Sequence, residues 1–279
     1  MKSSIRLKAP AVLANARFVQ AASRSRFPAS TPGILVLAVV FALAVRTGVT
    51  DVQAGIVPPF VTVQFGTDPS NLETATIEFP NLPEPLPKPF TVSIADPVEL
   101  RDGQNNLIGT IEDLDITIDP DPLVIMNFAV LAGNFPANFN ITSALVNFPA
   151  LVNPTAFASA GFSATDGSTP GNGVSVDLIS PNTGLFTAEY NGGTEFAALL
   201  AGQSTAVPTT ISSSSDTGFP PGVLNATVSS IQSHFDFRLS ANDRLAGNGR
   251  FEVLIPEPSS LMILIVGLLA SCRFVRRLS

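Results

Sequence analysis

The chain has 279 residues and a formal net charge of −7, a length that suits one large domain or two small ones. Residues 55–255 hold five basic and twenty acidic residues, a net charge of −15. Because phosphate binding requires clustered Lys and Arg, so acidic a body argues against nucleic acid as a partner. The single cysteine is Cys272, so residues 55–255 have neither a disulfide nor a thiolate metal ligand.

The N-terminal segment predicts export. Residues 1–32 carry six positive charges and no acid, and an uninterrupted apolar run follows at residues 33–45. This order, closed by small residues, is typical of a secretory signal peptide. We expect residues 1–54 to be a signal peptide with a long basic n-region, cleaved between Ala54 and Gly55. A retained membrane anchor is the alternative, but thirteen apolar residues fall short of the ~20 that span a bilayer.

Residues 55–255 predict a succession of short β-strands. Segments that alternate apolar and polar residues, and short apolar runs, are separated by turns rich in Gly, Pro, Asn and Asp. Residues 135–152 predict further strands around one irregular turn, and residues 195–200 predict either a strand or a single helical turn. The remaining strands are expected at residues 61–65, 74–79, 90–95, 107–118, 123–131, 156–166, 173–179, 185–190, 224–231, 233–240 and 250–254.

Several stretches between these strands predict connections. Residues 83–89 have proline at every second position, which indicates a semi-rigid connector, with a polyproline recognition motif as the alternative. Residues 102–105 predict a hairpin turn, residues 208–222 a long surface loop, and residues 242–249 a turn into the last strand. About ten to twelve strands without a long amphipathic helix predict an all-β fold, an antiparallel β-sandwich of the jelly-roll or Ig-like type.

One predicted strand, within residues 107–121, is strongly acidic. Alternation places Asp113, Asp115 and Asp119 on one face and apolar residues on the other. Clustered carboxylates suit Ca²⁺, for which these three residues and Asp121 are the candidate ligands. Alternate residues of a strand lie ~6–7 Å apart, too far for all of them to bind one ion. A solvated acidic face is therefore the preferred interpretation, a surface Ca²⁺ site is the alternative, and no other cofactor is expected.

The residues offer little for catalysis. His234 is the only histidine, which excludes a multi-histidine metal site. Alternation places it beside Asp236 on the polar face of a strand, opposite Phe235 and Phe237, as an exposed strand histidine. The chain has no Gly-x-Ser-x-Gly elbow to present a nucleophile. Two carboxylates suffice for a glycosidase, but sugar clefts favour aromatic platforms, and the chain has no Trp and only Tyr190. A secreted hydrolase is the least favoured class, and we expect a protein that is not an enzyme.

The C-terminal residues carry a distinctive arrangement. A Pro-Glu-Pro motif, an apolar segment and a basic cluster follow one another. They are formed by Pro256, Glu257, Pro258, residues 261–272, Arg273, Arg276 and Arg277. The prolines prevent a helix or strand from running on into the apolar segment, and the arginines suit the cytoplasmic end of a membrane span. We therefore expect residues 256–279 to form a separate C-terminal signal with a transmembrane helix.

This arrangement resembles the PEP-CTERM sorting signal of exported bacterial proteins over about residues 255–279. The resemblance implies that an exosortase, a membrane transpeptidase-like enzyme, recognises the Pro-Glu-Pro motif. It also implies a transient anchor in the inner membrane, followed by delivery to the cell envelope or extracellular matrix. Residues 55–255 would then be a non-catalytic β-sandwich. The alternative is a secreted carbohydrate- or calcium-binding module on the same scaffold, with an extracellular polysaccharide as its partner.

Overall fold

The computed structural model describes residues 55–77, 89–119, 121–168, 171–207, 209–218 and 221–254. Every regular element among these residues is a β-strand, which confirms the all-β prediction. No helix in these ranges is both long and apolar enough to span a membrane. The strands are β1 Gly55–Gly66, β2 Glu73–Ile77, β3 Phe90–Ser93, β4 Val98–Arg101, β5 Leu107–Asp119, β6 Leu123–Ala132, β7 Ala137–Val152, β8 Thr155–Thr165, β9 Val174–Asp177, β10 Phe186–Tyr190, β11 Thr194–Leu199, β12 Gln203–Thr205, β13 Thr210–Asp216, β14 Gly222–Val223, β15 Thr227–Leu239 and β16 Arg244–Leu254.

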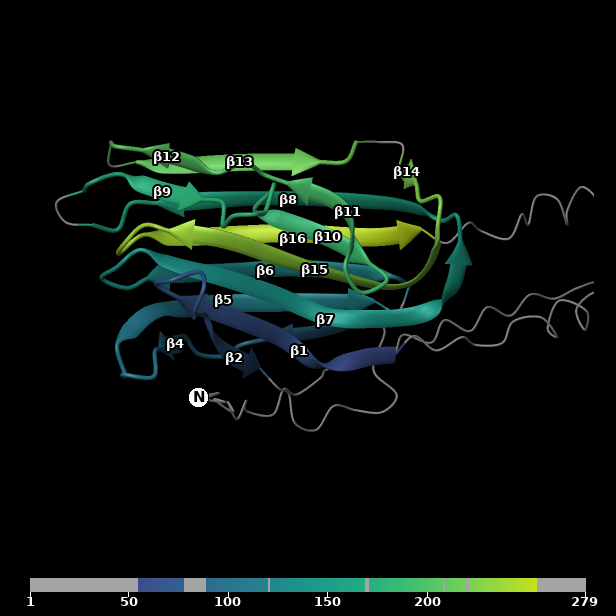
Figure 1. The fold of residues 1–279 in the computed structure, drawn as a ribbon, viewed down its shortest axis with the longest axis horizontal. Helices are drawn as coiled ribbons and strands as arrows, with labels where there is room; N and C mark the ends of the chain where they lie inside the picture. The colour runs from purple at the N-terminus through teal and green to yellow at the C-terminus, as the bar shows by residue number, and fades with distance from the viewer. Residues whose placement is uncertain are drawn as a thin grey trace, which may run out of the picture.

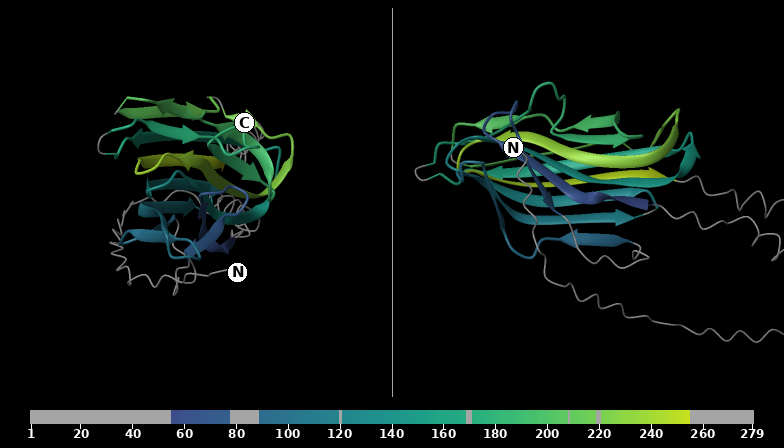
Figure 2. Two further views of the ribbon diagram at one scale, coloured as in Figure 1. Left: turned by 60° about the vertical axis from the view of Figure 1, so that its left-hand side comes forward. Right: turned by 60° about the horizontal axis from the view of Figure 1, so that its bottom comes forward.

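The strands form two eight-stranded sheets in which every pairing is antiparallel. Sheet A has the order β11–β10–β15–β7–β1–β2, and β9 and β12 extend it beside β15. Sheet B has the order β13–β8–β16–β6–β5–β3, with β14 on β8 and β4 on β5. Figure 1 shows the long strands side by side, with β12 and β13 along one edge and β2 and β4 along the other. The long strands of both sheets run along one direction (Figure 2), as in a β-sandwich.

Phenylalanine rings join the inner faces of the two sheets. Phe128 of sheet B lies with its ring centroid 4.9 Å from that of Phe235 and 5.9 Å from that of Phe237, both on β15 of sheet A. Phe139 stacks on Phe237 at 5.5 Å, and Phe186 lies 5.0 Å from Phe235. All five side chains are buried, so this cluster, called here the phenylalanine cluster, forms part of a core shared by both sheets.

Two glycines of β16 give these rings their space. A Cβ atom on Gly249 would lie 2.5 Å from Cε2 of Phe186 and 2.9 Å from Cε2 of Phe235, and one on Gly247 would lie 2.5 Å from Cζ of Phe128. Both glycines face inward at positions where alternation would otherwise place a buried side chain. The rings therefore occupy the volume that side chains on β16 would have filled.

The prediction of residues 242–249 as a turn is wrong, because β16 already begins at Arg244 and contains both glycines. The loop predicted at residues 208–222 contains β13 and the first residue of β14, because both strands pair with β8. Residues 135–152 contain the single strand β7, whose register shifts against β15 replace the expected turn. The two strands expected at residues 224–240 are likewise one strand, β15.

The other differences are smaller. Residues 195–200 lie mainly in the strand β11, and β4 was not predicted at all. The hairpin turn predicted at residues 102–105 is confirmed, and it joins β4 to β5. The described residues form sixteen strands in place of the ten to twelve expected, because several connections hold short strands of their own. Most of the proline-rich connector lies outside the described residues.

The glycines under the phenylalanine cluster can be tested by substitution. We expect Gly249→Ala to lower the free energy of unfolding by about 1–3 kcal/mol, because the added methyl group overpacks a filled core. Gly103→Ala is the matched control, since a Cβ atom there meets only Glu73 Oε1, at an ordinary 3.5 Å. Urea unfolding followed by circular dichroism measures both changes. Equal stabilities of the two variants would contradict the proposed role of the bare backbone.

Candidate functional site

The acidic strand β5 lies in sheet B with its carboxylates outward. Leu114, Ile116 and Ile118 are fully buried, as the alternation predicts, while the aspartates face away from the core. Asp115 accepts a hydrogen bond from Ser93 Oγ at 3.0 Å, and Asp119 Oδ1 accepts one from the backbone N–H of Asp121 at 3.0 Å.

The four candidate calcium ligands are spread along β5 and the turn after it. They are Asp113, Asp115, Asp119 and Asp121. Within the ranges that the structure describes, no group of three or more His, Cys, Asp or Glu side chains is placed to hold a metal ion. The structure therefore does not gather these carboxylates into one site.

The outer face of sheet B carries rows of polar residues that run across the strands. Its central row contains two asparagines directly opposite each other, Asn127 on β6 and Asn248 on β16. Strand register extends this row in both directions. The whole row is Ser93, Asp115, Asn127, Asn248, Gly161 and Ser214.

A groove of about 650 Å³ lies over this row, where β13, β8, β16 and β6 run side by side. Its centre is formed by Asn127, Asn248 and Gly161, and Asp216 and Arg250 line it as well. A Cβ atom on Gly161 would lie 2.8 Å from Asn248 Oδ1, so the missing side chain leaves room for the asparagine amide. We call this hollow the sheet B groove.

Both charged residues of the sheet B groove already have partners. Arg250 forms an ion pair with Glu252, and Asp216 Oδ1 accepts a hydrogen bond from the backbone N–H of Gly218 at 2.7 Å. The asparagines differ, because neither Asn127 nor Asn248 makes a side-chain hydrogen bond to any described residue. The groove thus offers unpaired amides at its centre, with an ion-paired arginine and a hydrogen-bonded carboxylate beside them.

Sequence reasoning missed the sheet B groove. Asn248 was assigned to a turn, and Asn127 lies in the short apolar run predicted to be a strand at residues 123–131. Asn127 interrupts that run and is exposed in the structure, which was the one available signal of a solvent-facing side.

The outer face of sheet A carries a second polar cluster. His234 Nε2 lies 3.1 Å from Asp236 Oδ2, and Asn140 Nδ2 donates a hydrogen bond to the other oxygen of Asp236. Thr142 Oγ1 in turn donates to Asn140 Oδ1 at 2.6 Å. His234 and Asp236 share the face opposite Phe235, as predicted. The prediction of an exposed histidine is wrong, because the two side chains are only 17% and 9% exposed.

Opposing effects set the protonation of His234. Burial lowers its pKa, but the hydrogen bond and the negative charge of Asp236, with the charges of Glu189 and Glu195, raise the pKa above its usual 6.5. The protonated form therefore contributes stability that is fully present below pH 6.5 and is lost as the pH rises through the raised pKa. No hydroxyl or thiol hydrogen-bonds to His234 among the described residues, so this cluster lacks the nucleophile–base contact of a hydrolase.

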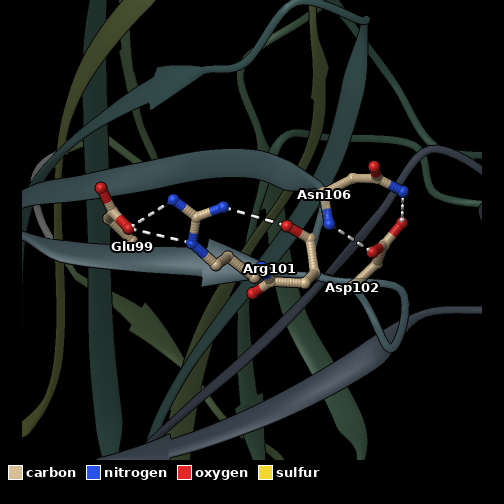
Figure 3. Close-up of polar contacts among 5 residues, drawn as sticks. Glu99, Arg101, Asp102 and Asn106 are labelled. Carbon is tan, nitrogen blue, oxygen red and sulfur yellow. Dashed lines mark hydrogen bonds and ion pairs between the residues drawn. The ribbon is translucent and has the colours of Figure 1, made fainter.

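A third cluster of polar contacts lies at the hairpin between β4 and β5 (Figure 3). Arg101 binds Glu99 Oε2 through Nη2 at 2.8 Å and donates from Nη1 to the carbonyl of Asn105 at 3.0 Å. Asp102 accepts hydrogen bonds from the backbone N–H and side-chain amide of Asn106, which lower the pKa of Asp102. Asn105 has a positive φ of 68°, which turn asparagines tolerate. These contacts stabilise the turn.

The predicted sorting and signal-cleavage residues lie at the two ends of the chain. They lie outside the described residues, except for Gly55, where β1 begins. The others are Ala54, Pro256, Glu257, Pro258, Arg273, Arg276 and Arg277.

A comparison of the chain with protein-family models gives no match, and neither does a comparison with curated proteins.

The sole histidine makes the sheet A cluster directly measurable. We expect the imidazole signal of His234 in a proton NMR titration to have a midpoint above pH 6.5, and Asp236→Asn to lower it. Glu112→Gln is the control, because Glu112 pairs with Arg244 on sheet B and should leave the midpoint unchanged. A midpoint unaffected by Asp236→Asn would show that the pair does not set the pKa.

Proposed function

We propose that this is an exported, exosortase-sorted protein of the cell envelope or extracellular matrix, with a β-sandwich body that is not an enzyme. The observation that carries the proposal is the order of its parts. A basic and apolar segment precedes Ala54, the described strands run from Gly55 to Leu254, and the Pro-Glu-Pro motif begins at Pro256. The folded body thus fills the interval between the two proposed processing signals.

The position of the terminal strands supports this division. β16 is hydrogen-bonded on both sides, to β6 and β8, and β1 is paired with both β7 and β2. All of these pairings lie within residues 55–254. Cleavage after Ala54 and removal of the tail near Pro256 would therefore leave the ladders intact, as a protein processed at both ends requires.

We infer jelly-roll rather than Ig-like connectivity for this body. In sheet B the last strand, β16, lies between β6 and β8, and β13 lies on the other side of β8. In sheet A the late strand β15 lies between β10 and β7. The chain repeatedly crosses between the sheets and inserts late strands between early ones. Such interleaving is a feature of the Greek keys of a jelly roll.

Two features support a structural or binding role over catalysis. His234 pairs with Asp236 and makes no hydrogen bond to a hydroxyl group of any described residue, although Thr142 and Thr187 lie opposite it on the neighbouring strands. The net charge of −15 on residues 55–255 suits a soluble, self-repelling extracellular body.

The sorting motif can be tested in a bacterium that contains an exosortase. We expect combined substitution of Pro256, Glu257 and Pro258 by alanine to abolish tail removal and to retain the chain in the inner membrane. Cell fractionation and mass spectrometry of the C-terminus measure the outcome. Combined Ser259→Ala and Ser260→Ala is the matched control, because it changes the adjoining residues and leaves the motif intact. Unchanged processing of the motif variant would refute exosortase sorting.

Export can be tested separately at the N-terminus. We expect the mature chain to begin at Gly55, and Ala54→Phe to block cleavage, because signal peptidase sites require small residues. N-terminal sequencing of the exported protein reads out both results, and Val49→Ala serves as a control outside the cleavage site. A mature chain that keeps residues 33–45 would instead support the retained anchor.

A further inference from the structure

We propose that the sheet B groove binds a neutral polysaccharide, an inference that goes beyond the sorting function and does not depend on it. The groove is a solvent-open hollow of about 650 Å³, within the ~300–1,000 Å³ typical of ligand sites. It crosses four strands, whose three gaps span roughly 14 Å at ~4.8 Å each. An extended ligand can therefore lie across β13, β8, β16 and β6.

The asparagine pair supplies the recognition chemistry. Asn127 and Asn248 face each other across β6 and β16, and both side chains are exposed. Neither amide hydrogen-bonds to another described residue, so both keep their full set of two donors and one acceptor. A sugar hydroxyl also both donates and accepts, so adjacent hydroxyls can pair with an amide at both its oxygen and its nitrogen. Ser159, Ser163 and Ser214 add hydroxyls around the pair.

The floor of the groove is lowered by small residues. Gly161 lies opposite Asn248 on the neighbouring strand, and Ala246 is the outward-facing residue that precedes Asn248 on β16. Any side chain on Gly161 would enter the space that the Asn248 amide uses, since its Cβ atom would lie 2.8 Å from Oδ1. The absence of a side chain at Gly161 therefore lets the Asn248 amide lie beside β8.

Charge selects a neutral ligand over an anionic one. Arg250, the one cation that lines the groove, is paired with Glu252, whereas Asp216 keeps its negative charge while it accepts a hydrogen bond from the backbone N–H of Gly218. The net charge of −15 over residues 55–255 disfavours an anionic polysaccharide as well. Without an aromatic platform, each sugar unit binds through polar contacts alone. Tight attachment then requires several copies of the protein along one polymer chain.

A pull-down with insoluble polysaccharides tests the proposal. The full chain, solubilised in a mild detergent, is mixed with cellulose, with a β-1,3-glucan gel, with chitin and with anionic alginate beads. We expect retention on at least one of the three neutral polymers and none on alginate. Combined Asn127→Ala and Asn248→Ala should weaken retention about tenfold, because roughly two net hydrogen bonds of ~0.5–1.5 kcal/mol each are lost. Gly161→Val should weaken it at least as much by filling the groove.

Asn147→Ala is the matched control. Asn147 is an outward-facing asparagine of β7 on sheet A, and its amide likewise makes no hydrogen bond to a described residue. Thermal unfolding of each variant checks that the fold is kept. Absence of retention on all three neutral polymers, unchanged retention of the asparagine variant, or preference for alginate would each overturn the proposal. None of these results depends on tail processing, so this test and the sorting test can fail independently.

Discussion

The close approach of phenylalanine rings to the bare backbone of β16 is the contact on which the sandwich depends. Residues 55–255 have no cysteine and no tryptophan, so disulfides cannot hold the sheets, and apart from Tyr190 the aromatic rings all come from phenylalanine. Phe128 and Phe235 meet from opposite sheets, and Gly247 and Gly249 give the rings room. Aromatic burial of this kind contributes both area and directional ring contacts. The core thus fixes the distance between the sheets and the register of their inner faces.

A core fixed in this way leaves the two outer faces free to differ. On sheet A, Thr142, Asn140, Asp236 and His234 form one chain of contacts in which the polar groups satisfy one another. On sheet B the central asparagines remain unpaired beneath open solvent. Satisfied polar networks stabilise a structure, whereas unpaired, accessible groups are available to a ligand. This contrast is the physical reason to look for binding on sheet B.

The strands that alternate were predictable from sequence, because β8, and β5 from Asp113 onward, bury every second side chain. Three kinds of segment were not. Gly247 and Gly249 look like turn residues, and only the rings of distant strands explain their place in β16. Ser212 to Ser215 look like a loop, yet pairing with β8 makes them an edge strand. Asn127 and Asn248 form a site only through the pairing of β6 with β16, which no local pattern encodes.

The strand β16 connects the proposed binding site to the proposed sorting signal. Asn248 lies six residues before Leu254, and an extended strand rises ~3.3 Å per residue, so the centre of the groove lies roughly 20 Å from the end of the body. Before sorting, the proposed C-terminal anchor would keep Leu254 near the membrane, and the centre of the groove would lie roughly 20 Å from Leu254 along β16. Contact with an external polymer would then be restricted by the membrane. Release by the exosortase would remove this restriction without changing the groove, since β16 is held on both sides by β6 and β8.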